Sequence, residues 1–405
     1  MTGPLAIDGG EPVRSRPMPP WPVVDEEAIE VVTSVLRSGR LNYWFGEHGR
    51  AFEREYAESL GRAHAIALAN GTLALELALR AFGIGEGDEV IVPSRTFIAT
   101  ASAAVAVGAK PVIADIDVDS GNMTHDTVAA VLGPRTRAII PVHLGGWPVD
   151  IDPLLELARQ HDLRVIEDCA QAHGASYKER PVGGLGSDAA TFSFCQDKIL
   201  PLGEGGMLVL DDTGAYERAW EYKDHGKSLR KLEAPTEAAG IGFRWLVDSF
   251  GTNWRLSETA SAMCRIALKR LPEYHERRRT NAMRLAVGLA ELPGLRVPLP
   301  PADCEHAFYR LYGYVIPEAL SPEWGRDRIA QAITAEGVPC QYGTCAEIYR
   351  EHAFAEAGLG PSARLPYAAA AHETSLAFFV HPTLHDSDID DTIAAVCKVM
   401  GVATT

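Results

Sequence analysis

Short apolar segments separated by helix-like stretches dominate the chain between residues 89 and 210. Four of these segments are rich in Val and Ile without alternation, which is typical of strands buried on both faces of a sheet. The segments are EVIVP (89–93), KPVIADI (110–116), RAIIPV (137–142), LRVIEDCA (163–170), AATFSF (189–194) and GMLVL (206–210). Helical patterns such as THDTVAAVL (124–132) and DPLLELARQHD (152–162) lie between several of them. This order predicts an α/β domain with a mostly parallel sheet, in which ligands bind at the carboxyl ends of the strands.

The regions on either side of this core have different patterns. Residues 25–83 are predicted to be largely helical, with helices that stop at Gly61 and Gly83. A long helical stretch begins with LSETASAMCRIALKRL (256–271), and Pro272 is expected to kink or break it. Shorter strands and helices follow after PLPPADC (298–304). We therefore predict an N-terminal arm over residues 1–24, a large α/β domain over 25–264 and a smaller α+β domain over 265–405.

Composition narrows the classes of function. The formal net charge of −16 argues against a nucleic-acid partner, because phosphates favour a face rich in Lys and Arg. No apolar run approaches the length of a membrane span, and the N-terminus lacks the apolar stretch of a signal peptide, so we expect a cytoplasmic protein that binds no membrane. The seven cysteines form no CxxC pair, so we expect neither a metal site nor a disulfide framework.

The segment VIEDCAQAHG (165–174) places Asp168 where an apolar strand ends. A carboxylate at the end of a buried strand is costly unless a cation faces it. The cation can be a structural arginine, or it can be the protonated ring nitrogen of a pyridine cofactor, which the carboxylate would keep charged.

Three other segments carry groups that suit the same cofactor. ANGTLALELAL (69–79) places Gly71 and Thr72 at a helix N-terminus, where free N–H groups bind anions, although such residues also serve as simple caps. TFSFCQDKILPLGEGGM (191–207) offers the Ser193 hydroxyl and Lys198, whose amine can form a Schiff base with an aldehyde or can be an ordinary surface charge. Phe97 follows a predicted strand and can stack on a ring or belong to the core. Together these groups are the set that pyridoxal 5′-phosphate requires.

The wording and order of six segments identify a family. NGTLALELAL (70–79), GDEVIVPSRTFIAT (87–100), VIEDCAQAHGA (165–175), FSFCQDKILPLGEGGM (192–207), GTNWRLSE (251–258) and ETSLAFFVHPTL (373–384) resemble the DegT/DnrJ/EryC1/StrS family of sugar aminotransferases. The resemblance extends from about residue 20 to about residue 400. It implies the aspartate-aminotransferase fold, called fold type I, with a large domain built on a mostly parallel sheet and a smaller C-terminal α+β domain.

The resemblance also implies a role for each motif residue. Lys198 would hold the aldehyde of pyridoxal 5′-phosphate and shuttle protons, and Asp168 would pair with the pyridine nitrogen. Gln171 would face the cofactor ring and its hydroxyl, and Phe97 would stack on the ring. The phosphate would be held by Gly71, Thr72 and Ser193. Asn253 would reach the phosphate of the partner subunit, so that a homodimer shares its active sites.

The substrates are predicted from the same resemblance. Glutamate or glutamine would donate the amino group, and a nucleotide-linked 3- or 4-keto sugar would accept it. A keto-cyclitol of the scyllo-inosose type is the alternative acceptor within the same class. Two other classes are a non-catalytic regulator that keeps the fold and a fold type I lyase acting on an amino acid such as cysteine. The intact Lys198, Asp168 and Ser193 argue against the regulator, and release of pyruvate or ammonia without ketone-dependent turnover would indicate the lyase.

Five residues are candidates for substrate contact. Tyr43 and Trp44 lie in LNYWFGEHG (41–49), which matches a family loop that approaches substrate. His143 and His381 each end a predicted strand, and a structural role competes with substrate binding for both. Arg255 is a basic residue near the motifs that suits a diphosphate or the carboxylate of the amino donor.

Overall fold

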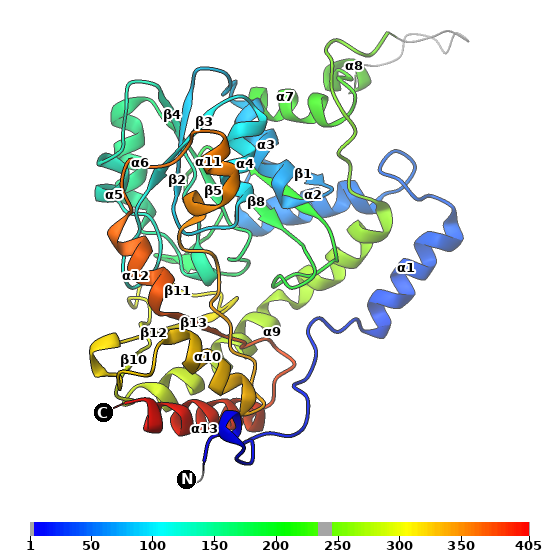
Figure 1. The fold of residues 1–405 in the computed structure, drawn as a ribbon. Helices are drawn as coiled ribbons and strands as arrows, with labels where there is room; N and C mark the ends of the chain where they lie inside the picture. Colours follow the sequence, from blue (N-terminus) through cyan, green and yellow to red (C-terminus); the bar gives the residue numbers. More distant parts are fainter. Residues whose placement is uncertain (1–3, 234–244, 405) are drawn as a thin grey trace.

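The computed structural model describes residues 4–233 and 245–404 of the chain. A seven-stranded sheet forms the centre of the larger part and occupies the upper half of Figure 1. Its strands run in the order β1-β9-β8-β5-β4-β2-β3, and β9 alone is antiparallel to its neighbours. The strand bounds are β1 (His64–Leu68), β2 (Glu89–Pro93), β3 (Lys110–Ala114), β4 (Thr136–Ile139), β5 (Arg164–Asp168), β8 (Ala189–Ser193) and β9 (Gly206–Leu210). The predicted mostly parallel sheet is confirmed.

The interior positions of the strands are largely apolar because both faces of the sheet are covered. In β5, Val165 packs into the cluster on the side of α2, α6 and α9, whereas Ile166 packs into the cluster on the side of α3, α4 and α7. Successive residues of a strand point to opposite faces, so a strand buried on both faces needs apolar residues at every position. The helices of this part are α1 (Glu26–Ser38), α2 (His48–Leu60), α3 (Gly71–Ala81), α4 (Ala99–Ala106), α5 (His125–Ala129), α6 (Ile151–His161), α7 (Thr213–Lys223) and α8 (Leu229–Glu233).

The prediction that residues 25–83 are largely helical needs one correction. Helices α2 and α3 form as predicted, and Gly61 follows α2 in the left-handed conformation. Strand β1 lies between them and pairs with β9 along its whole length. Its sequence, HAIAL, is short and contains two alanines, which have low strand propensity, so the pattern did not reveal it.

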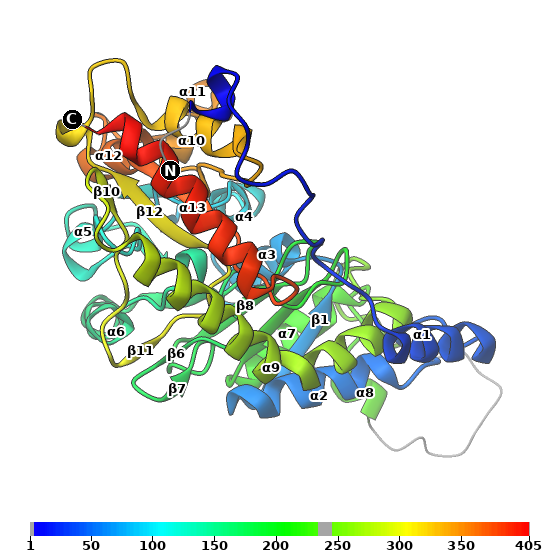
Figure 2. The ribbon, with the colours of Figure 1, turned by 90° about the horizontal axis from the view of Figure 1, so that it is seen from below.

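Helix α9 (Glu258–Leu289) continues through Pro272 over 32 residues, so the predicted break does not occur. It packs against α1 and α2 in its first part and against α13 in its last part, and Figure 2 shows it running from the large sheet to the C-terminal helices. These packing contacts hold the helix together on both sides of the proline. The boundary that we predict at residue 265 falls inside α9, which therefore connects the two parts.

The C-terminal part has its own small sheet and core. Antiparallel strands β10, β12 and β13 pack with α10 and α13 in one apolar cluster, and the N-terminal Leu5 belongs to it. A second three-stranded sheet joins the two parts, because β11 pairs with β6 of the larger part. The bounds are β6 (Ser176–Tyr177), β7 (Arg180–Pro181), β10 (Leu295–Arg296), β11 (Cys304–Glu305), β12 (Leu311–Val315), β13 (Ser375–Phe378), α10 (Arg326–Ala335), α11 (His352–Glu356), α12 (Pro366–Thr374) and α13 (Asp386–Ala403).

Four short 3-10 helices lie within the described residues, at Ala6–Asp8, Leu144–Gly146, Pro317–Ala319 and Ile348–Arg350. No helix in residues 4–233 and 245–404 has the length and apolar character needed to cross a membrane. All seven cysteines carry free thiols.

Candidate active site

A cavity of about 680 Å³, which we call the inner chamber, lies at the carboxyl edge of the large sheet. It is reached by residues that follow β2, β5 and β8 and by the N-terminus of α3. Seven of the predicted site residues line it: Gly71, Thr72, Phe97, Asp168, Gln171, Ser193 and Lys198. The structure thus brings together residues from four separated motifs, because the carboxyl ends of parallel strands meet at one edge.

Asp168 ends β5 and is 6% exposed. Its carboxylate accepts hydrogen bonds from the Thr100 hydroxyl at 2.9 Å and from the Ala170 N–H at 3.1 Å. Burial raises the pKa of Asp168, and these two hydrogen bonds offset that effect only in part. A cation placed in the chamber beside Asp168 would stabilise its ionised form.

Lys198 lies in the turn after β8, and its ammonium sits 4.8 Å from the centre of the Tyr309 ring. The residue is partly exposed, but its amine is buried, and this burial lowers the pKa of Lys198. The carboxylates of Asp197 and Asp168 act to raise that pKa, but their effect is smaller. A lowered pKa increases the fraction of neutral amine, which is the nucleophilic form. Its main-chain carbonyl accepts a hydrogen bond from the Trp21 indole, which fixes the N-terminal arm against this turn.

The floor of the inner chamber is a tight contact between the N-terminus of α3 and strand β9. The Asn70 side chain caps α3 by accepting from the Leu73 N–H at 2.9 Å. A Cβ added at Gly206 would lie 2.2 Å from the Asn70 carbonyl oxygen, and one added at Gly71 would lie 2.8 Å from the Ser193 Cβ. Glycine at both positions therefore lets the helix N-terminus and Ser193 approach each other. The N–H groups of the helix and the Ser193 hydroxyl then lie close together, which suits the binding of an anion.

Phe97 and Gln171 border the open side of the inner chamber. Phe97 lines the cavity and is 64% exposed, so much of its ring is open to contact with a ligand. The side-chain oxygen of Gln171, Oε1, accepts a hydrogen bond from the Gly145 N–H at 2.7 Å, which holds this side chain at the cavity wall. An exposed aromatic face in a cavity suits stacking on a planar ligand.

A second cavity of about 360 Å³, the outer chamber, adjoins the first and shares Phe97, Gln171 and Lys198 with it. Tyr309, Arg310 and Thr344 bring the C-terminal part into its wall. No sequence motif pointed to these three residues as part of the site, nor to Thr100, which donates a hydrogen bond to Asp168. The segment AFYRLYGYV (307–315) carries no motif whose chemistry can be interpreted without the fold.

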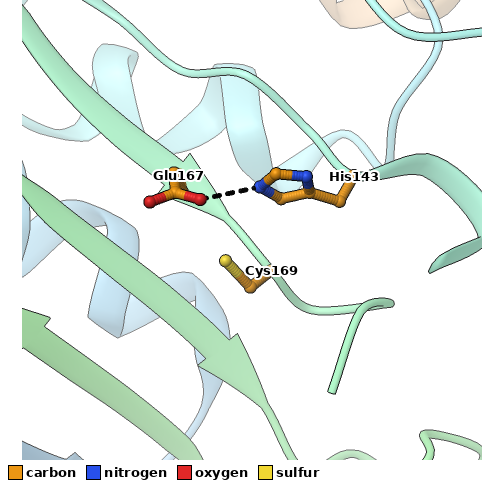
Figure 3. A group of neighbouring side chains, drawn as sticks. All are labelled: His143, Glu167 and Cys169. Atoms are coloured by element: carbon orange, nitrogen blue, oxygen red, sulfur yellow. Dashed lines mark hydrogen bonds and ion pairs between the residues drawn. The ribbon is translucent and has the colours of Figure 1, made fainter. Parts of the chain in front are cut away.

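His143, predicted as a substrate contact, does not line either chamber. Its ring is fully buried, Nδ1 accepts from the Val149 N–H at 3.0 Å, and Nε2 lies 3.0 Å from a Glu167 oxygen. Figure 3 shows this pair beside Cys169. In this arrangement no ring nitrogen remains for a substrate, so His143 has the structural role that competed with substrate binding.

The same three side chains have the spacing of a metal site, since their ligand atoms lie within 4.8 Å of one another. Burial raises the pKa of the Cys169 thiol well above its ordinary value, and both His143 nitrogens are engaged. Burial also acts to raise the pKa of Glu167, but hydrogen bonds from His143 and Ser187 bring it below its ordinary value. The hydrogen-bonded pair of His143 and Glu167 and the buried Cys169 thiol are therefore explained as parts of the core.

Four further candidates lie away from both chambers, in one region of connected contacts around Asp224 and Trp44. Tyr43 and Trp44 line a separate cavity of about 490 Å³ near α2 and α7. Asn253 pairs through its main chain with Asp224, and the Arg255 guanidinium binds the Asp224 carboxylate at 2.8 Å. Lys227 also binds Asp224 and lies 4.4 Å from the Trp44 ring, so it links the two groups. The chain's own inner chamber contains none of these residues.

His381 lines a fourth cavity of about 260 Å³, the arm chamber, beside residues Met18, Pro19 and Trp21 of the N-terminal arm. Its Nδ1 lies 2.9 Å from the Thr383 hydroxyl, and its ring stacks on Trp21. Burial and the neighbouring Arg278 and Arg310 lower the pKa of His381 to about 3, so the imidazole is neutral at pH 7.

Comparison with known proteins gives this geometry a context. The model of the DegT/DnrJ/EryC1/StrS aminotransferase family matches residues 22–397. The chain is 39% identical over 344 residues to a putative L-glutamine:3-amino-2,3-dideoxy-scyllo-inosose aminotransferase of Streptoalloteichus tenebrarius, covering 84% of this chain and 79% of that one. It is 35% identical to the spore coat polysaccharide biosynthesis protein SpsC of Bacillus subtilis, covering 94% and 96% of the two chains. The X-ray structure of an aminotransferase from Psychrobacter cryohalolentis matches with a TM-score of 0.93 at 46% identity, over 95% of this chain and 99% of that one.

Pyridoxal 5′-phosphate is the cofactor of this fold type I chain, and the inner chamber fits it. The N-terminus of α3 with Thr72 and Ser193 would hold the phosphate, and the exposed ring of Phe97 would stack on the ring of the cofactor. Asp168 would stabilise a protonated ring nitrogen, and the Lys198 amine would bind the aldehyde. The buried, incompletely compensated carboxylate of Asp168 is the observation that favours a cationic ring.

Proposed function

Because this chain belongs to the DegT/DnrJ/EryC1/StrS aminotransferase family, we propose that it transfers the amino group of L-glutamine or L-glutamate to an uncharged keto-cyclitol of the scyllo-inosose type. It is a pyridoxal phosphate-dependent aminotransferase, and the identity of the two substrates is the proposed part. The observation that carries the proposal is the charge around the two chambers, considered with the relative from Streptoalloteichus tenebrarius.

The cofactor, when bound, supplies an electron sink for the carbon that loses its proton. Lys198 is placed to take the proton from the donor Cα and would pass it to the cofactor carbon that carries the amino group, because its amine lies in the chamber and burial lowers its pKa. Asp168 would keep the ring nitrogen protonated, which makes the electron sink effective. Thr100 positions Asp168 through the 2.9 Å hydrogen bond to its carboxylate.

The acceptor is proposed from the side chains that it would meet. Among the described residues that line the inner and outer chambers, only Lys198 and Arg310 are cations, whereas Asp168, Asp197, Glu204 and Glu351 are acids. A nucleotide diphosphate needs several cations, and Lys198 is committed to the cofactor. A neutral polyhydroxylated ketone needs none, so the cyclitol moves ahead of the nucleotide sugar that the sequence analysis placed first.

A nucleotide-linked keto sugar remains the second candidate on one specific observation. Arg255 and Lys227 lie together on a surface outside the chain's own chambers. A partner subunit that presents this surface to the outer chamber would bring both cations near a diphosphate, but both already bind the buried Asp224, so the charge they offer is partly neutralised and the cyclitol stays first. The relation to the spore coat polysaccharide protein is consistent with this candidate.

The same surface supports a homodimer with shared active sites. Asp224 is fully buried and holds the segment that carries Asn253 and Arg255, yet these residues reach no cavity lined by Lys198 of their own chain. We propose that they complete the chambers of a second copy. Mixing the K198A and N253A variants tests this: hybrid dimers should recover activity that neither variant has, and an inactive mixture would refute the shared site.

The substrate proposal is tested by two half-reactions on the purified enzyme. L-glutamine should convert the cofactor to its amino form, which is followed by loss of its visible absorbance. Scyllo-inosose or 2-deoxy-scyllo-inosose should then restore that absorbance, whereas nucleotide-linked 4-keto sugars should not. Restoration by a nucleotide sugar alone would select the second candidate, and a cofactor that no amino donor converts would refute the aminotransferase assignment.

A further inference from the structure

An arginine at the wall between two cavities has no assigned role in the proposed reaction. Arg310 lines the outer chamber together with Lys198, and it also lines the arm chamber. It is 7% exposed and comes immediately before β12. Among the described residues that line the inner and outer chambers, it is the only guanidinium.

The Arg310 side chain is held in a fixed orientation. Its guanidinium carbon lies 4.3 Å from the centre of the Tyr309 ring and 4.4 Å from that of Phe379, and Nη1 donates to the Tyr309 carbonyl at 2.9 Å. Nη2 donates to Asp197 at 3.2 Å, which is a long contact for an ion pair. The Asp197 side chain is half-exposed, so its ion pair with the guanidinium is weakened by solvent, although the same carboxylate also accepts a hydrogen bond from the Tyr309 hydroxyl.

The surroundings of Arg310 contain an excess of buried positive charge. Arg278 is fully buried, and its Nε and Nη2 have no hydrogen-bond partner. Burial, together with Arg310, lowers the pKa of Arg278 to about 9. Asp197 is the acid that contacts this group of cations, so an additional anion would be electrostatically favoured here.

We propose that Arg310 binds the α-carboxylate of the amino donor, and that Asp197 takes its place at the guanidinium when the uncharged ketone occupies the site. This inference rests on the proposed function and assigns the residue that lets one site accept two unlike substrates. The donor carries a carboxylate beside the amino group that must reach Lys198, whereas a keto-cyclitol carries hydroxyls only. A planar guanidinium binds a carboxylate through two parallel hydrogen bonds, which also orients the Cα–H bond for proton removal.

The experiment removes the charge from either partner of the proposed contact. Wild type, R310M and R310K are compared in the half-reaction with L-glutamine and with its α-amide, which lacks the carboxylate. In wild type the α-amide should react about thirtyfold or more less efficiently, as expected for loss of one partner of a buried charge pair. In R310M both compounds should react equally poorly. The efficiency of R310K with L-glutamine should fall between those of wild type and R310M. Equal effects of the arginine substitution on both compounds would overturn the proposal.

A binding measurement separates recognition from chemistry. Glutarate, which has no amino group to transfer, should bind the wild-type holoenzyme in calorimetry and bind R310M about thirtyfold or more weakly. R326M is the matched control, since Arg326 also lies over a tyrosine ring, at 3.7 Å, but lines none of the three chambers. It should bind glutarate like wild type. Unchanged glutarate binding in R310M would refute the role of Arg310, whereas failure of wild type to react with either L-glutamine or L-glutamate would refute the proposed function instead.

The D197N variant tests the exchange of anions. Without its charge, residue 197 should compete less well for Arg310, so glutarate should bind more tightly than to wild type. If glutarate binds D197N more weakly, Asp197 supports the anion site rather than substituting for the donor, and the exchange is refuted.

Discussion

The contact between Gly206 and the N-terminus of α3 allows a sharp prediction. The Cβ of a G206A variant would lie 2.2 Å from the Asn70 carbonyl oxygen, 2.4 Å from the Asn70 carbonyl carbon and 2.7 Å from the Gly71 nitrogen. Ordinary van der Waals contact begins near 3.4 Å, so the turn must move by about 1.2 Å. Gly206 pairs with Leu68 of β1 on one side and with Ser193 of β8 on the other, and this pairing on both sides prevents β9 from moving instead.

The displacement has two expected consequences. Overpacking of this kind costs about 1–3 kcal/mol of the free energy of unfolding. The shift also withdraws the α3 N–H groups from the phosphate, and charge-assisted hydrogen bonds contribute about 1.5–3 kcal/mol each, so pyridoxal phosphate should bind about ten- to a hundredfold more weakly. Denaturation of the apo protein measures the first quantity, and titration with the cofactor measures the second.

The control is a glycine with free space around it. Gly401 lies near the end of α13, and a Cβ there meets no atom within 4 Å. G401A should raise the free energy of unfolding by about 0.5–1 kcal/mol, as expected for Gly to Ala in a helix, and should leave cofactor affinity unchanged. A G206A variant that binds the cofactor like wild type would show that the α3 N-terminus does not hold the phosphate.

Three further predictions concern the buried groups. Burial raises the pKa of Asp168, and only the ionised carboxylate holds a protonated ring nitrogen, so cofactor affinity should fall as the pH decreases through that raised pKa. The T100V variant loses a hydrogen bond to the carboxylate, so the fall in affinity should begin at a higher pH in the same titration. The H143A variant leaves Glu167 buried without its imidazole partner, so denaturation should show that the free energy of unfolding falls by about 3–5 kcal/mol, while the KM values of both substrates stay unchanged. A raised KM at unchanged stability would instead identify His143 as a substrate contact. Borohydride reduction should fix the cofactor covalently to wild type but not to K198A, as checked by mass spectrometry, and a labelled K198A would move the attachment to another lysine.

The sequence alone predicted those parts of the site whose residues follow a buried strand. Asp168 and Ser193 end continuous apolar runs, and Phe97 follows one, so the parallel sheet brings them to one edge. Gly71 and Thr72 were recognisable because a helix N-terminus has a local signature.

The remaining parts depend on contacts between distant segments. Thr100 binds a carboxylate 68 positions away, and Arg310 enters the outer chamber from the C-terminal part. No local pattern marks either residue. Helix α9 was predicted to break at Pro272 because local propensity was the only guide, and packing on both sides of the proline overrides it.

The two neighbouring carboxylates of β5 show how the fold divides structure from function. Successive residues of a strand point to opposite faces, so Glu167 and Asp168 enter different surroundings. Glu167 forms hydrogen bonds with His143 (Figure 3) and with the hydroxyl of Ser187. These bonds outweigh the effect of burial and keep the pKa of Glu167 below its ordinary value.

Asp168 accepts hydrogen bonds from one hydroxyl and one N–H, and its pKa is raised although the nearby Lys198 acts to lower it. Its ionised form therefore destabilises the protein until a further cation arrives in the inner chamber. The protonated ring of the cofactor supplies that cation, so part of its binding free energy comes from relieving a cost that the fold has built in at Asp168. An isosteric D168N variant should accordingly be more stable than wild type as apo protein at pH 7 and should gain less stability when the cofactor is added.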